Sequence, residues 1–214
     1  MGVAILVIGK SGSGKSASLR NFNPNDVGII NVLGKPMPFR GQHKPLVTDD
    51  YGTVINALSK ATRDAIVIDD AGYLITNQFM RGHGSTGAGN AVFQLYNQLA
   101  GNFWGLVSMI QVLPPEKRVY VMMHEDEHDS GTVKPKTIGK LLDEKVCVEG
   151  MFTICLRAIV QDGKHMFRTQ TNGLDVAKSP IGMFEADEID NDLAAVDAAI
   201  MDYYGIKRKE EKAQ

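Results

Sequence analysis

The chain has 214 residues, of which 43% are hydrophobic and 22% are charged, and its formal net charge at pH 7 is −2. This composition is ordinary for a globular protein and excludes general disorder, and the small net charge excludes a protein that coats nucleic acid through bulk positive charge. The length predicts one domain over residues 1–206, followed by a charged flexible tail over 207–214. No apolar stretch is long enough to cross a membrane and no signal peptide is recognisable, so we expect an intracellular protein.

Short apolar runs alternate with helical patterns along the first two thirds of the chain. Four of these runs are rich in β-branched residues and predict buried strands, at residues 3–8, 27–33, 65–68 and 119–123. Helical spacing and end signals predict helices from residue 14 to about 21–25, from a cap at Asp49 or Asp50 to residue 60, and at 72–81 and 90–112. The glycine-rich patch at 82–89 is interpreted either as a mobile binding loop or as a linker.

The pattern changes beyond the fourth strand. Strand-like runs at 152–160 and 164–169 flank Gln161-Asp162-Gly163, a sequence typical of a hairpin turn. A last helix is predicted over 191–204 and is closed by Gly205. Strands that alternate with helices and then give way to a hairpin predict an α/β fold. Its sheet should be mostly parallel, flanked by helices, with a C-terminal antiparallel hairpin.

The most specific motif follows the first predicted strand directly. Residues 9–16 read GKSGSGKS and match the phosphate-loop pattern G-x-x-x-x-G-K-[ST] at every fixed position. Glycines let backbone N–H groups point at phosphate oxygens, the lysine reaches the β- and γ-phosphates, and the last hydroxyl ligates Mg²⁺. We expect the phosphates to be surrounded by Gly9, Lys10, Ser11, Gly12, Ser13, Gly14, Lys15, Ser16 and Ala17. Lys15 is the expected catalytic cation, and Ser16 an expected metal ligand.

Acidic and polar residues follow two of the other predicted strands. Asp69 ends the third strand, at the carboxyl edge where ligands bind in open α/β sheets, so we expect it to hold Mg²⁺ together with Ser16. Asp70 comes next and either polarises the attacking water or caps the following helix. His124 ends the fourth strand and is either a sensor of the γ-phosphate or an ordinary loop histidine.

Residues 124–128 read HEDEH and match the zinc-protease pattern H-E-x-x-H. That pattern binds zinc only on a helix, where both histidines share one face. The strand predicted immediately before it, and Asp129-Ser130-Gly131 immediately after it, favour an acidic loop instead. We therefore reject a zinc site here.

The two cysteines, Cys147 and Cys155, lie in an apolar stretch without the C-x-x-C spacing of metal or redox sites. In a reducing compartment they are expected to be small core residues rather than a disulfide or a metal pair.

Basic residues gather after the fourth strand. The first group is Lys134, Lys136, Lys140 and Lys145, and Arg157, Lys164, Arg168 and Lys178 follow on or near the hairpin. A cation brought to the γ-phosphate from a neighbouring subunit speeds phosphoryl transfer, and lysines also bind nucleic-acid backbones. The candidates for a trans-acting or DNA-contacting role are Arg81, Lys136, Lys140 and Lys178; the alternative is a solvated charged face.

Six segments together carry a resemblance to a known family: GKSGSGKS, AIVIDD, KTIGKLLDEK, VEGMFTI, AKSPIGMF and NDLAAVDAAI. Over about residues 3–205 they resemble a family of bacteriophage P-loop ATPases with a RecA-like core. The resemblance implies ATP bound by residues 9–16, Mg²⁺ supported by Asp69, a ring or filament of subunits, and a place in the host cytoplasm. Because some relatives are single-strand annealing ATPases of phage recombination, it also implies single-stranded DNA and a single-stranded-DNA-binding protein as partners.

One departure from this family concerns catalysis. RecA-like enzymes usually carry a catalytic glutamate at the end of the strand after the phosphate-loop helix, but that strand here reads GIINVLGK and has no acid. Either Asp70 takes the role or hydrolysis is slow.

Three functions are therefore open. The leading one is a Mg²⁺-dependent ATPase of phage DNA recombination or replication. The second is an ATP-dependent assembly switch with little turnover that regulates a protein partner. The third, a small-molecule kinase, is disfavoured because no arginine-rich lid segment follows the helical middle of the chain. No N-K-x-D segment for guanine is present, which favours ATP over GTP.

Overall fold

The structure is a computed structural model and describes residues 1–84, 87 and 89–207. Most of the expected tail, and part of the glycine-rich patch, lie outside the described residues. The strands are β1 (Val3–Gly9), β2 (Val27–Asn31), β3 (Leu46–Val47), β4 (Ala65–Asp69), β5 (Arg118–Glu127), β6 (Val133–Pro135), β7 (Ile154–Gln161), β8 (Lys164–Arg168) and β9 (Glu188–Asp190). The α-helices are α1 (Tyr51–Ser59), α2 (Gly72–His83), α3 (Asn90–Gln111) and α4 (Leu193–Tyr204), and the short helices of other types are η1 (Ser16–Asn21), η2 (Leu141–Lys145) and η3 (Glu149–Met151).

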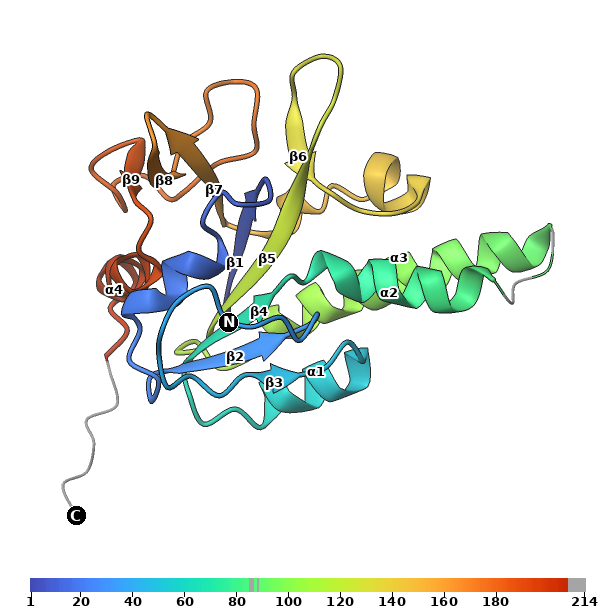
Figure 1. Cartoon of the computed structure of the whole chain (residues 1–214), viewed down its shortest axis with the longest axis horizontal. Coiled ribbons are helices and arrows are strands. Elements are labelled where there is room, and N and C mark those ends of the chain that lie inside the picture. Colours follow the sequence, from blue (N-terminus) through green and yellow to red (C-terminus); the bar gives the residue numbers. More distant parts are fainter. Residues whose placement is uncertain (85–86, 88, 208–214) are drawn as a thin grey trace.

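The chain folds as an α/β protein around a mixed sheet. Within the described residues the sheet has nine strands in the order β3-β2-β4-β5-β1-β7-β8-β9, and β6 pairs with the far end of β5. The β3–β2, β2–β4, β4–β5, β5–β1 and β1–β7 pairs are parallel. The β7–β8, β8–β9 and β5–β6 pairs are antiparallel (Figure 1). The predicted mostly parallel sheet with a C-terminal antiparallel hairpin is confirmed.

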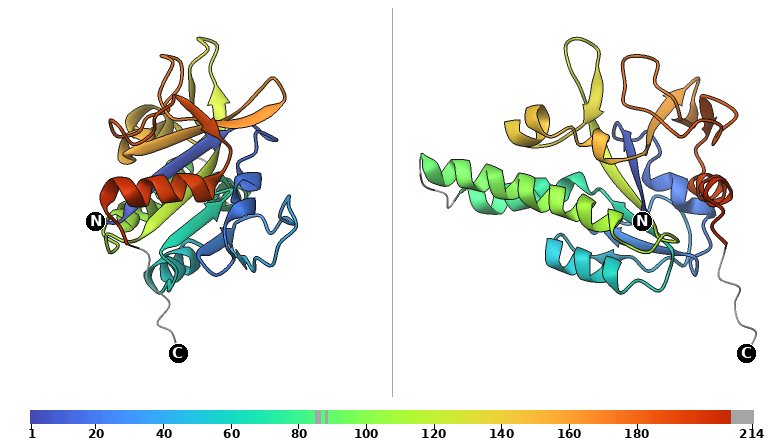
Figure 2. Two further views of the ribbon diagram at one scale, coloured as in Figure 1. Left: turned by 90° about the vertical axis from the view of Figure 1, so that its left-hand side faces the viewer. Right: turned by 180° about the vertical axis from the view of Figure 1, so that it is seen from behind.

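Helices cover both faces of the sheet because the central strands are apolar on both sides. In β1, Leu6 and Ile8 pack toward α1, α2 and α3, and the alternate residues Ile5 and Val7 pack toward η1 and α4. Figure 2 shows α4 crossing one face of the sheet and the longer helices lying on the other. Helices α2 and α3 lie side by side and extend beyond the edge of the sheet (Figures 1 and 2).

Local signals place several element ends as predicted. The side chain of Asp50 accepts a hydrogen bond from Thr53 N at 2.7 Å and caps α1. Asp162 and Gly163 have φ values of 50° and 74°, as a tight hairpin turn between β7 and β8 requires. Gly205, with φ 64°, ends α4.

Several element boundaries differ from the prediction, three of them next to the phosphate loop or at the ends of central strands. The segment after the phosphate loop is a six-residue 3₁₀ helix, Ser16–Asn21, and not an α-helix. Strand β2 ends at Asn31, whose side chain turns the chain by accepting from Gly34 N at 2.8 Å and donating to Lys35 O at 2.7 Å. Strand β5 does not end at His124 but continues to Glu127, because β6 pairs with residues 125–127. In the described part of the chain, none of the helices is long and apolar enough to cross a membrane.

Candidate nucleotide-binding site

Parallel pairing brings the carboxyl ends of β1, β4 and β5 to one edge of the sheet. Gly9 at the end of β1 lies opposite His124 of β5, and β5 in turn separates β1 from β4, which ends in Asp69. The phosphate loop and the acidic residues that the sequence singles out therefore meet at the same edge. This is the edge at which open α/β sheets bind ligands.

Two glycines of the loop are required by close contacts. A Cβ atom on Gly9 would lie 2.4 Å from Ser13 Oγ and 2.7 Å from Ala158 O, too close to be tolerated. Gly14 has a φ of 99°, and a Cβ there would crowd the side chains of Asn191 and His165 at 3.0 Å. The motif glycines thus let the loop fold tightly against β7 and the C-terminal elements.

Lys15 is the buried cation of the loop. Its ammonium group donates hydrogen bonds to Gly9 O at 2.7 Å and to Lys10 O at 2.9 Å. Burial lowers its pKa, while the nearby carboxylates of Asp70 and Asp69 act in the opposite direction. The backbone N–H groups of Gly12, Gly14 and Lys15 donate no hydrogen bond to any residue that the structure describes. Those N–H groups and the lysine suit an anion with several oxygens.

Ser16 and Asp69 form the contact that links the loop to the sheet. Ser16 Oγ donates to Asp69 Oδ1 at 2.8 Å, although the two residues are 53 positions apart in the chain. Burial raises the pKa of Asp69, and the hydroxyl of Ser16 and the charges of Lys35 and Lys15 partly offset that rise. A hydroxyl and a carboxylate are oxygen ligands of the kind that Mg²⁺ prefers, and it completes its shell with waters and substrate phosphates. The donor set therefore fits Mg²⁺ bound together with a phosphate.

Asp70 lies beside this pair in an unusual backbone conformation, with φ 58°. Its carboxylate contacts Lys35 Nζ at 2.7 Å and His124 Nε2 at 3.6 Å. Burial on its own would raise the pKa of Asp70, but the contacts with His124 and Lys35 outweigh it and lower the pKa to about 2. The alternative role of helix cap is wrong, since α2 begins after Ala71 with no side-chain cap.

His124 lies within β5 at the level of the phosphate loop, so its interpretation as a loop histidine is wrong. Its ring meets that of Tyr73 edge-on, with the ring centres 5.9 Å apart. Both rings line a cavity of about 540 Å³ that also borders Lys10, Ser11 and Lys35. The cavity therefore connects His124 with the first residues of the phosphate loop and with Lys35.

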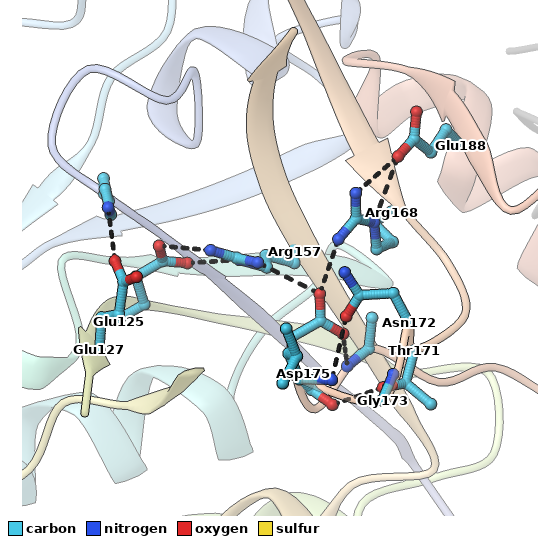
Figure 3. Close-up of polar contacts among 12 residues, drawn as sticks. Glu125, Glu127, Arg157, Arg168, Thr171, Asn172, Gly173, Asp175 and Glu188 are labelled. Atoms are coloured by element: carbon cyan, nitrogen blue, oxygen red, sulfur yellow. Dashed lines mark hydrogen bonds and ion pairs between the residues drawn. The ribbon is translucent and has the colours of Figure 1, made fainter. Parts of the chain in front are cut away.

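An ion-pair network ties the loop to the β5–β6 ribbon and the C-terminal hairpin (Figure 3). Glu125, whose side chain is 2% exposed, accepts two hydrogen bonds from Arg157, at 2.9 and 3.0 Å. Arg157 also contacts the fully buried carboxylate of Asp175, which pairs with Arg168 in turn. Lys10 of the loop pairs with Glu127 at 2.7 Å. Two arginines that the sequence offered as surface cations are therefore engaged inside the protein.

The C-terminal elements support the loop from the other side. His165 Nδ1 lies 3.0 Å from Ser13 O, and since a carbonyl only accepts, the imidazole nitrogen donates. Arg20 of η1 donates to Asn191 O at 2.6 Å, and the side-chain amide of Asn191 is buried with no hydrogen-bond partner among the described residues. The loop is thus held between β7, β8 and the start of α4.

The four proposed trans-acting residues lie in different places. Lys136 lines the cavity beside the loop, and Lys140 is exposed just before η2. Arg81 pairs with Asp49 near the end of α2. The backbone of Lys178 forms an isolated β-bridge with Cys155, which pairs with Leu6 of β1. Leu6 lies three residues before Gly9, so Lys178 is about 10 Å from the carboxyl edge of the sheet. Within one subunit, only Lys136 of these reaches the cavity.

The segment 124–128 and the cysteines give two further outcomes. The segment is an extended strand over most of its length and neither a helix nor a loop, which places His124 and His128 about 13 Å apart along the backbone. Cys155 is buried as expected, but Cys147 is exposed, so its assignment to the core is wrong. Burial raises the pKa of Cys155 to about 12.

Sequence reasoning missed several residues of the site, of which Lys35 is the most important. Lys35 follows β2, whose carboxyl end lies at the same edge of the sheet as those of β1 and β4. The rule that identified Asp69 could therefore have identified Lys35. Comparison with protein-family models finds no model that matches this chain, and a search of curated proteins finds no match either.

Proposed function

We propose that the chain binds a nucleoside triphosphate with Mg²⁺ and hydrolyses it slowly. The observation that supports this most directly is the 2.8 Å contact between Ser16 of the loop and Asp69 of β4. These are the two residues that a phosphate-loop nucleoside triphosphatase needs for metal binding, and they are in contact although they lie 53 positions apart in the chain. ATP is the proposed nucleotide because the chain has no guanine-reading N-K-x-D segment.

Each residue of the site has a part in this proposal. The loop N–H groups and Lys15 bind and orient the phosphates, and Ser16 and Asp69 hold Mg²⁺, which would neutralise charge on the phosphate oxygens. His124 reaches the cavity beside the loop as a hydrogen-bond donor to the terminal phosphate. Asp70 is the carboxylate that could polarise the attacking water once its contacts with Lys35 and His124 are loosened.

A RecA-like core is proposed in addition to the α/β fold. In RecA-like ATPases a strand with a polar sensor residue lies between the phosphate-loop strand and the strand that ends in the metal-binding acid. Here β5 with His124 lies between β1 and β4. The sequence resemblance extends the proposal to phage DNA recombination or replication in the host cytoplasm, to single-stranded DNA with its binding protein, and to a ring or filament of subunits.

The second candidate, an assembly switch with little turnover, is favoured by a specific observation. Strand β2 ends in Asn31 and is followed by Lys35, where RecA-like ATPases carry an acid, and Asp70 is engaged by two basic groups. A carboxylate bound to an ammonium group is a weak base. Slow hydrolysis is common to both candidates, so they differ in whether the bound nucleotide changes the assembly of the protein.

The test is nucleotide binding and turnover by the wild type and by Lys15→Ala. Titration calorimetry with Mg²⁺-ATP should give binding to the wild type and none to the variant, and hydrolysis should disappear with it. Unchanged hydrolysis by Lys15→Ala would refute the assignment of the loop.

Light scattering with ATP, with ADP and without nucleotide separates the two candidates. Only an assembly switch changes the mass of the assembly with the nucleotide while turnover stays negligible. Added single-stranded DNA at low and high salt tests the DNA partner, since phosphate contacts weaken steeply with salt.

A further inference from the structure

The loop after β2 places the ammonium group of Lys35 at the candidate site. Asn31 fixes this loop through its two side-chain hydrogen bonds, to Gly34 N and Lys35 O. The backbone of Lys35 is therefore anchored to the carboxyl end of a central strand. Its side chain remains 60% exposed and reaches Asp70 Oδ2 at 2.7 Å.

The charge of Lys35 acts on the same groups as that of Lys15. Burial is the main cause of the lowered pKa of Lys15, and the positive charge of Lys35 lowers it further. The pKa of Lys35 itself is raised, first of all by its hydrogen bond to Asp70. The geometry places Lys35 beside the same carboxylates, since its ammonium group lies 2.7 Å from Asp70 and Asn31, which anchors its loop, pairs with Asp69.

The two lysines differ in burial. Lys15 is buried and bonded to carbonyl oxygens of its own loop, whereas Lys35 lines the cavity beside the loop together with Lys10, Ser11 and His124. Because the Lys35 side chain is 60% exposed and lines the cavity, it can turn from Asp70 to another anion that enters there. A terminal phosphate carries more charge than one carboxylate and is a stronger partner for an ammonium group.

We propose that Lys35 recognises the terminal phosphate of the bound nucleotide, so that the site distinguishes a triphosphate from a diphosphate. The inference rests on the proposed function, since it requires the loop to hold the nucleotide. Lys35 exchanges its partner Asp70 for the terminal phosphate, which removes one of the two contacts that engage the Asp70 carboxylate. A diphosphate offers no such partner, and Lys35 then stays with Asp70.

The experiment compares Mg²⁺-bound ADP and a non-hydrolysable ATP analogue by titration calorimetry. The proteins are the wild type, Lys35→Gln, Lys35→Arg and, as a matched control, Lys44→Gln, an exposed lysine of the same loop. The wild type and Lys44→Gln should bind the analogue more tightly than ADP. Lys35→Gln should lose about 10- to 100-fold of its affinity for the analogue and keep that for ADP within about 3-fold. Lys35→Arg, which keeps the charge, should recover most of the loss.

The outcomes separate this inference from the proposed function. An unchanged preference for the analogue in Lys35→Gln would overturn the inference, and so would an equal loss for both nucleotides, which indicates a merely structural lysine. If the folded wild type binds neither nucleotide, the proposed function fails and the inference fails with it. Circular dichroism and thermal unfolding of each variant show that a loss of binding is not a loss of fold.

Discussion

The buried ion pair between Asp197 of α4 and Arg118 of β5 gives the sharpest prediction about stability. Asp197 of α4 accepts hydrogen bonds from Arg118 at 2.6 and 3.0 Å and from the hydroxyl of Tyr120 at 2.6 Å. The side chains of Asp197 and Arg118 are each 5% exposed, and Tyr120 is fully buried. Burial and the charge of Asp197 raise the pKa of Tyr120, so this hydroxyl stays protonated and donates.

Asp197→Ala leaves a buried guanidinium group without its ion-pair partner and a buried hydroxyl without its acceptor. Removal of one member of a buried ion pair costs about 3–5 kcal/mol. For a chain of this size each kcal/mol lowers the melting temperature by about 2–4 °C, so we expect a fall of roughly 6–20 °C. Urea unfolding followed by circular dichroism measures the free energy, with Asp202→Ala, an exposed aspartate of the same helix, as the control.

The control should change the free energy of unfolding by less than about 0.5 kcal/mol, as surface substitutions usually do. A loss of less than about 1 kcal/mol in Asp197→Ala would refute the reasoning, because water would then satisfy Arg118 and the hydroxyl of Tyr120. A change in the slope with urea would instead point to a change in the unfolded state, and the comparison would need the melting temperature.

Three further predictions concern the loop, the ion-pair network and the cysteines. Gly9→Ala should abolish nucleotide binding in calorimetry, because its Cβ would meet Ala158 O at 2.7 Å; normal binding would show that the loop can move away from β7. Arg157→Met leaves Glu125 buried without its cation and should lower the free energy of unfolding by about 3–5 kcal/mol in a urea titration, whereas an unchanged midpoint would mean that Glu125 reaches water. A thiol reagent at pH 8 should modify Cys147 alone in the native protein and both cysteines in urea, read by mass spectrometry, since burial raises the pKa of Cys155 to about 12; native labelling of Cys155 would contradict its burial.

The parts of the fold that could be predicted are those with strong local signals. The apolar runs gave the central strands, and the glycine motif after 3–8 together with Asp69 after 65–68 put two groups at the carboxyl edge of a parallel sheet. That two such groups touch is a consequence of strand order, which periodicity does not determine. The sequence predicted that Ser16 and Asp69 share a metal site, and the structure adds the strand order and the direct contact between them.

The missed features depend on partners distant in the sequence. Residues 124–127 contain no apolar residue, so nothing local predicts a strand there; β6 supplies the pairing that extends β5. Arg157 resembles any surface arginine until Glu125 and Asp175 are placed beside it. Cys147 lies in an apolar stretch, but the stretch forms short turns at the surface rather than a buried strand.

The position of β5 between β1 and β4 sets the distance between the strand that precedes the phosphate loop and the strand that ends in Asp69. Two strand spacings separate β1 from β4, about 10 Å in all, and backbone hydrogen bonding fixes that width. Side-chain replacements in the sheet can loosen its packing without widening the gap. A one-residue shift in the register of β5 would keep this width but turn the His124 side chain to the opposite face of the sheet. The register of β5 therefore determines which side chain lies beside Gly9.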